Sequence, residues 1–139
     1  MENTKSLASA RSISGGGPAA NAAALLGHWG VSAAMAGPVG RDPFCDVVIE
    51  ELKDYGVDTR GVLPCDGYPT PVSAILVNDS NGSRSIINHR STEDLYRLPD
   101  TLYGLNPEVL LFDGHSLAAA REAMECWPEA ATILDAGSL

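Results

Sequence analysis

Residues 15–21 read GGGPAAN and lead into an alanine-rich run that we expect to form a helix over residues 18–29. Glycines let the backbone approach a ligand closely, and a proline suits the first position of a helix. Backbone amides at a helix N-terminus, together with the helix dipole, favour a polar or anionic group. This stretch therefore predicts a ligand-binding turn, with a tight turn required only by packing as the alternative.

The composition is that of a globular domain. The chain has 139 residues, 45% of them hydrophobic, which is enough apolar material for one modest core. Its formal net charge of −9 argues against a nucleic-acid partner, because such binding depends on lysine and arginine. The three cysteines stand far apart and predict neither a disulfide framework nor a metal site. No run is apolar and long enough for a signal peptide or a membrane span, so we expect a cytoplasmic protein with no membrane partner.

The first half of the chain has the alternation of strands and helices that is typical of an α/β fold. Alternating apolar and polar residues over residues 6–14 predict a strand with one face open to water. Short apolar runs predict further strands over residues 31–37 and 61–65. Between them, Asp42 has the position of an N-cap before a helix over residues 43–55. The face of this helix that we expect to meet water carries Glu50, Glu51, Lys53 and Asp54.

A hairpin then interrupts the α/β alternation. Residues 71–77 and 83–89 are rich in strand-forming side chains, and Asn81-Gly82 between them predicts an antiparallel hairpin. The alternation returns in the last third of the chain. There we expect a short helix near residues 94–103, strands over residues 108–112 and 131–134, and a helix over residues 118–127. Because the chain stops soon after an apolar strand, we expect an incomplete domain.

Several strings, in a fixed order, resemble the ribokinase-like (PfkB) carbohydrate kinases. The pattern G-G-x-x-x-N, formed by Gly16, Gly17 and Asn21, resembles the sugar-binding motif of that family. The strings that follow it are AMAGPVGRD (34–42), EELKDYGVDTRGV (50–62), TPVSAILVNDSNGSRSII (70–87), LLFDGH (110–115) and TILDAGS (132–138). Their order and spacing together are more specific than any one of them.

The resemblance implies a fold and a domain assignment. The fold would be a three-layer α/β sandwich, with a mainly parallel sheet, helices on both faces and a small β-lid. The lid would consist of the strands at residues 6–14 and 71–89. The chain, residues 1–139, would be the N-terminal, substrate-binding part of one kinase domain. In the family such lids often pair with another subunit, so the resemblance also implies a homodimer through the lid.

The resemblance further implies an activity: transfer of the γ-phosphoryl group of ATP, with Mg2+, to a hydroxyl of a sugar or a related polyol or nucleoside. An amide side chain and free backbone N–H groups suit vicinal hydroxyls, which both donate and accept hydrogen bonds. Strand ends of α/β sheets also bind ligands, and the hairpin strands would wall the pocket or meet an anionic group. The expected substrate-binding residues are Gly16, Gly17, Asn21, Ser73, Ile75, Arg84, Asn88, Asp113 and His115.

Two parts of the family pattern do not occur in the sequence. The first is the aspartate of the family's first strand, which grips the sugar. The second is the G-A-G-D motif, which supplies the anion hole and the catalytic base and belongs with the ATP site in the C-terminal half. We therefore expect this segment to hold no catalytic residue and no metal ligand, and to transfer no phosphoryl group by itself.

Three other interpretations remain open. The chain could bind a sugar without catalysis, or it could be a truncated product with no stable fold. It could also be a Rossmann-type oxidoreductase that uses Gly15, Gly17 and Ala20 as a G-x-G-x-x-A fingerprint. Against that last interpretation, the fingerprint must follow a buried apolar strand, and residues 8–14 are polar in every second place.

Overall fold

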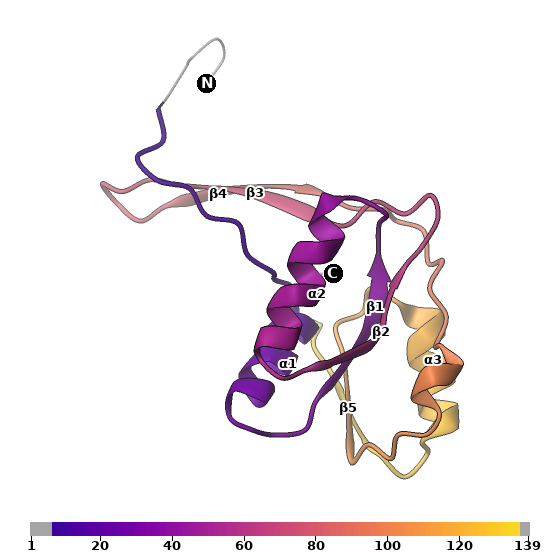
Figure 1. The fold of residues 1–139 in the computed structure, drawn as a ribbon. Helices are drawn as coiled ribbons and strands as arrows, with labels where there is room; N and C mark the ends of the chain where they lie inside the picture. The colour runs from indigo at the N-terminus through magenta and orange to yellow at the C-terminus, as the bar shows by residue number, and fades with distance from the viewer. Residues whose placement is uncertain (1–6, 137–139) are drawn as a thin grey trace.

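The computed structural model describes residues 7–136 (Figure 1). Along the chain, helices and strands alternate before and after one antiparallel hairpin. The elements in chain order are α1 (Pro18–His28), β1 (Ala34–Val39), α2 (Pro43–Asp54), β2 (Asp58–Pro64), β3 (Val72–Val77), β4 (Arg84–His89), the short 3-10 helix η1 (Asp100–Leu102), β5 (Val109–Phe112), α3 (Leu117–Cys126) and β6 (Ala131–Leu134).

The strands of the described residues form three pairs. β1 pairs with β2 and β5 pairs with β6, both in parallel, whereas β3 and β4 are antiparallel. α1 and α2 lie on one side of β1 and β2, and α3 lies on the other side, against β5 (Figure 1). The expected α/β fold, with parallel strands and helices on both sides, is therefore confirmed, and its parallel strands lie in two separate pairs.

Each parallel pair has its own hydrophobic core. Buried side chains of the first core come from α1, β1, α2, β2 and the residue directly before β2, and those of the second come from η1, α3 and the connection before η1. The first core contains Ala23, Val39, Cys45, Leu52, Val57 and Val62. The second contains Leu98, Leu102 and Ala123, packed against Leu105, Leu110, Phe112 and Trp127.

Local signals in the sequence place the ends of the first two helices correctly. Pro18 opens α1, and Gly30 follows its end with φ 76°. The carboxylate of Asp42 caps α2 by accepting a hydrogen bond of 3.0 Å from the backbone N–H of Phe44. Gly56, with φ 77°, follows the end of α2. These four signals are short-range, which is why the sequence alone predicts them.

Two expected elements are wrong. Residues 7–14 form no strand, and residue 6 lies outside the described residues. Leu7 and Ile13 are 93% and 73% exposed, and no described strand pairs with residues 7–14, so of the two expected lid elements only the hairpin is present. The helix expected near residues 94–103 is reduced to η1, because the backbone N–H of Leu98 donates to the Glu122 side chain instead of a helical carbonyl.

The first strand also starts later than the sequence predicts, at residue 34 rather than 31. The backbone N–H of Val31 donates to the carbonyl of Leu26 and so closes the end of α1. Val31 is therefore part of the helix terminus, and it is not available to a strand ladder.

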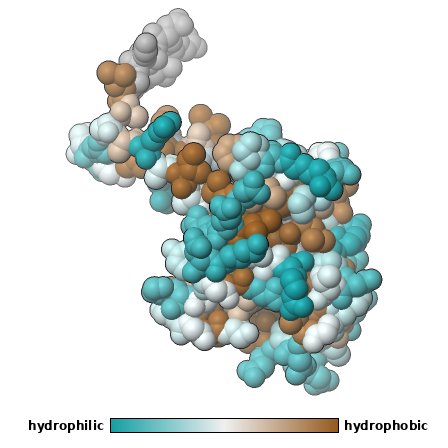
Figure 2. Space-filling view, in the orientation of Figure 1, coloured by the Kyte–Doolittle hydropathy of each residue, from teal (hydrophilic) through white to brown (hydrophobic). Residues whose placement is uncertain are grey.

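The hairpin of β3 and β4 projects from the rest of the molecule (Figure 1). Its turn is closed by a hydrogen bond of 2.8 Å from the N–H of Asn78 to the carbonyl of Ser83, and Gly82 has φ 69°, so the hairpin prediction is confirmed. Apolar side chains remain exposed along the projection, as Figure 2 shows. The most exposed of the large ones are Ile75, Leu76, Val77, Ile86 and Ile87, at 49–66%.

Gly40, directly after β1, joins three segments of the chain. Its N–H donates to the hydroxyl of Thr70 at 2.8 Å, and the N–H of Thr70 donates to the carboxylate of Asp42 at 2.9 Å. A Cβ on Gly40 would clash with that carboxylate and lie 2.6 Å from both the nitrogen of Thr70 and the carbonyl oxygen of Tyr68. Close approach of backbone to backbone therefore requires glycine here and ties the hairpin to the start of α2.

We expect Gly40→Ala to lower the free energy of unfolding by about 1–3 kcal/mol, because the backbone atoms around the new methyl group cannot move aside easily. Gly37→Ala, in the same strand, is the control, since its Cβ would meet nothing closer than the Cε of Met35 at 3.9 Å. Urea unfolding of both variants checks the prediction. Equal unfolding midpoints would contradict the steric argument.

A second prediction concerns acid stability. The hydrogen bond from the backbone N–H of Thr70 holds the pKa of the Asp42 carboxyl below its ordinary value, although partial burial acts the other way. As the pH falls, Asp42 is therefore protonated in the unfolded chain before it is protonated in the folded protein. Its contribution to the free energy of unfolding is complete above the unfolded pKa and is lost below about pH 4. In urea titrations we expect Asp42→Asn to lose less stability in acid than the wild type. Asp46→Asn, on the same helix, is the control, and an unchanged acid dependence in Asp42→Asn would refute the assignment.

Candidate functional site

The glycine turn before α1 presents bare backbone to solvent. Gly17, with φ 97°, is the N-cap of α1, and no side chain caps this helix. The N–H of Asn21 donates to the carbonyl of Gly17 at 2.9 Å, which places Asn21 one helical turn further on with its side chain exposed. Gly16 is exposed as well. The structure therefore brings together Gly16, Gly17 and Asn21, as the sequence pattern requires.

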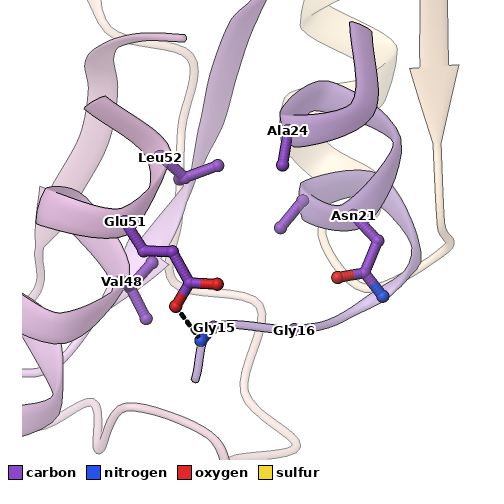
Figure 3. A pocket seen from close by; sticks show the side chains of 8 residues that line it. Gly15, Gly16, Asn21, Ala24, Val48, Glu51 and Leu52 are labelled. Carbon is purple, nitrogen blue, oxygen red and sulfur yellow. Dashed lines mark hydrogen bonds between the residues drawn. The ribbon is translucent and has the colours of Figure 1, made fainter. Parts of the chain in front are cut away.

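A small cavity separates this turn from α2 (Figure 3). Its volume of about 20 Å³ is enough for roughly one water molecule, so a sugar does not fit inside it. The carboxylate of Glu51 lies beside the cavity and accepts a hydrogen bond of 2.5 Å from the N–H of Gly15. The residues around the cavity are Gly15, Gly16, Ala20, Asn21, Ala24, Val48, Glu51 and Leu52. A ligand of the glycine turn would therefore lie on its solvent side.

Glu51 is a residue that sequence reasoning missed. Its pattern on α2 predicts a solvent-facing side chain, whereas the structure shows it half-buried against the turn. Its partner Gly15 lies 36 residues earlier in the chain. Helical periodicity identifies which face a side chain occupies, and it carries no information about a distant backbone segment that packs beside that face.

The four hairpin residues expected in the site share one face. Ser73 lies opposite Asn88 in the ladder, and its hydroxyl donates to the Asn88 side chain at 2.7 Å. Ile75 lies two residues along β3 from Ser73, and Arg84 lies opposite Val77. Arg84 is therefore at the turn end of the hairpin, at the opposite end of β4 from Asn88. All four expected residues are exposed.

The end of β5 holds a hydrogen-bonded cluster that also contains the start of the connection after β4. The Nδ1 atom of His115 lies 3.1 Å from the carboxylate of Asp113, and the Nη1 atom of Arg90 lies 2.8 Å from Nε2 of the same ring. Because a guanidinium only donates hydrogen bonds, Nε2 accepts from Arg90, and the N–H at Nδ1 donates to the carboxylate of Asp113. Asp113 and His115 thus lie together, their place in a sugar pocket stays a prediction, and Arg90 is an addition that the sequence analysis did not single out.

Tyr68 lies near this cluster. Burial raises the pKa of its hydroxyl, the charge of Asp113 acts in the same direction, and the charge of Arg90 opposes both. The phenol therefore stays protonated at neutral pH and remains a hydrogen-bond donor.

The nine expected residues thus fall into three groups: the glycine turn, the hairpin face and the end of β5. Across residues 7–136, no hydrogen bond or ion pair joins one group directly to another, so a shared role in one pocket stays a prediction. Within the same residues, no set of three His, Cys, Asp or Glu side chains is placed to hold a metal ion. The described helices are also too short or too polar to cross a membrane.

A sequence model of the pfkB family carbohydrate kinases matches residues 2–135. The chain belongs to this family. Ketohexokinase of Mus musculus is 35% identical over 72 residues, which are 52% of this chain and 24% of that protein. The ATP-dependent ribose-1-phosphate kinase of Halopiger xanaduensis is 41% identical over 66 residues, which are 48% of this chain and 22% of that protein.

Solved structures confirm the ribokinase-like fold. The ribokinase of Arabidopsis thaliana, complexed with ribose and ATP, matches with a TM-score of 0.80 at 22% identity. The match covers 100% of this pfkB chain and 47% of that chain, so the chain spans about half the length of this relative. A Rossmann fingerprint, in contrast, needs a strand directly before its glycines, and residues 7–17 contain none.

Proposed function

We propose that the protein containing this chain transfers the γ-phosphoryl group of ATP to a hydroxyl of a sugar or a related polyol or nucleoside. The segment described here would supply the sugar-binding residues. The observation that carries the proposal is the exposed turn of Gly16 and Gly17 at the start of α1, with Asn21 one helical turn away, in a chain of the pfkB family.

The chemistry of this turn suits a neutral, hydroxyl-rich ligand. The N–H groups of Gly16 and Gly17 donate to hydroxyl oxygens, and the Asn21 amide both donates and accepts. Vicinal hydroxyls need both kinds of partner, and the positive end of the α1 dipole strengthens the backbone donors. The glycine turn would therefore fix the orientation of the sugar ring.

The other two groups would complete the pocket. Asp113 would accept hydrogen bonds from sugar hydroxyls at the end of β5, where α/β folds bind ligands. His115 and Arg90 hold one another there at 2.8 Å and would meet the polar side of the substrate. Ser73, Ile75, Asn88 and Arg84 lie on the hairpin face that would close over the site as a lid.

ATP and Mg2+ are proposed for the whole protein. Solved relatives named as kinases with bound ATP support ATP as the phosphoryl donor, among them the fructokinase of Xylella fastidiosa, with a TM-score of 0.68. Phosphoryl transfer generally needs a divalent ion, yet the described residues offer no cluster that fits one, and we assign no catalytic base to them.

We further propose a cytoplasmic location and a homodimer through the hairpin, whose apolar side chains are exposed.

The test is a panel of sugars with Mg-ATP, assayed on the full-length protein and on Asn21→Ala. Loss of the amide should raise the KM of the accepted sugar about tenfold with a smaller change in kcat, because the amide contributes mainly to binding. Asn106→Ala, an exposed asparagine outside the three groups, is the control. Sugar binding without turnover would refute catalysis, and an unchanged KM in Asn21→Ala would refute the role of the turn.

A further inference from the structure

We propose that Glu51 is a positioning residue for the sugar site, which holds the glycine turn in the conformation that presents Gly16 and Gly17 to the substrate. The inference rests on the proposed function, because it assigns a task to a residue that supports the same site. Glu51 belongs to α2 and would not touch the sugar itself.

The first step of the argument is the contact. The Glu51 carboxylate accepts the hydrogen bond of Gly15, the residue directly before the exposed pair (Figure 3). A hydrogen bond to a charged acceptor is stronger than one between neutral groups. This bond also borders a narrow cavity walled by apolar side chains of both helices, where little water competes for it. It is thus a firm anchor between the turn and α2.

The second step concerns which amide is bound. The carboxylate of Glu51 accepts a hydrogen bond from the N–H of Gly15. The N–H groups of Gly16 and Gly17 have no hydrogen-bond partner among the described residues, and both glycines are exposed. Three successive glycines lose more conformational entropy on ordering than any other tripeptide. An anchor on the first glycine limits the freedom of the next two and leaves their donors open to a ligand. Such preorganisation lowers the cost of binding.

The third step is the electrostatic state of α1. The first turn of this helix contains no acidic residue, and its N-cap Gly17 has no side chain to cap it. Helix N-termini normally gain stability from a nearby negative charge. Glu51 supplies that charge from a neighbouring helix. A side chain on α2 thus places a negative charge near the N-terminus of α1, while its hydrogen bond goes to Gly15, before the helix begins, and leaves Gly16 and Gly17 open.

The geometry at Gly15 fits this task. A Cβ at residue 15 would lie 3.3 Å from the Oε2 atom of Glu51, which is a tight contact. The carboxylate can therefore approach the backbone this closely because residue 15 is a glycine. Glu50, the adjacent residue on α2, has the same charge but is exposed and makes no described contact with the turn. The two glutamates therefore form a matched pair for an experiment.

The experiment compares Glu51→Ala, Glu51→Gln and Glu50→Ala in the full-length protein. In Glu51→Ala we expect the KM for the accepted sugar to rise about tenfold and kcat to stay within about twofold, because the anchor acts on binding. Glu51→Gln retains an oxygen that accepts from Gly15, so its KM should stay within about threefold of the wild type. Glu50→Ala should match the wild type.

Amide hydrogen exchange over residues 15–17, read without substrate, gives a second measure that does not depend on turnover. We expect clearly faster exchange there in Glu51→Ala, a smaller increase in Glu51→Gln, which keeps the acceptor oxygen but loses the charge, and no change in Glu50→Ala. Unchanged exchange in Glu51→Ala overturns the inference, as does a KM that rises equally in Glu51→Ala and Glu50→Ala. If the wild type phosphorylates no sugar, the proposed function fails, and the exchange data alone decide whether Glu51 orders the turn.

Discussion

The contact between Tyr96 and Gly61 holds the two halves of the structure together. Tyr96 is 2% exposed, and its hydroxyl donates to the carbonyl of Gly61 in β2. A Cβ on Gly61 would lie 2.7 Å from the Cδ1 atom of Leu102 and 2.8 Å from the carbonyl oxygen of Met35, so only glycine lets the connection pack this closely. Burial raises the pKa of Tyr96 well above its ordinary range, which keeps the hydroxyl a donor. Among the described residues no strand ladder joins β1–β2 to β5–β6, so this contact, together with the hydrogen bond from the Thr101 hydroxyl to the carbonyl of Arg60, links the two pairs.

Around this joint, the candidate site residues lie at element ends and are held by bonds from other elements. Glu51 of α2 holds the turn before α1 through Gly15, and Arg90 joins the chain after β4 to His115 at the end of β5. The exposed residues of the candidate site are therefore held in place by side chains from other segments of the chain. Loops commonly carry binding residues in this way, because a rigid scaffold of helices and strands positions their accessible polar groups.

The sequence predicts what depends on near neighbours and misses what depends on distant ones. Pro18, Asp42 and the Asn81-Gly82 turn act within a few residues, and the elements they begin or end are found in the structure. The strand expected over residues 6–14 depends on a partner that the pattern cannot supply, and it is absent from the described part, residues 7–14. Glu51 was misread for the same reason, because its partner lies 36 residues away. The family resemblance succeeded because the order of many short strings carries the long-range information that single motifs lack.

The stability of the hairpin depends on what covers its two exposed faces. One of its faces carries Ser73, Ile75 and Asn88, and the other carries Leu76 and Ile87, with every one of these side chains exposed. A two-stranded hairpin is marginally stable in water unless one face is covered. The first face also carries Val77, Arg84 and Ile86, and the second also carries Ser85 and His89, so both faces combine polar and apolar side chains that a ligand or a protein surface could cover. Covering either face would stabilise the same two strands, so the proposed substrate contact and the proposed subunit contact would reinforce each other through the order of the hairpin.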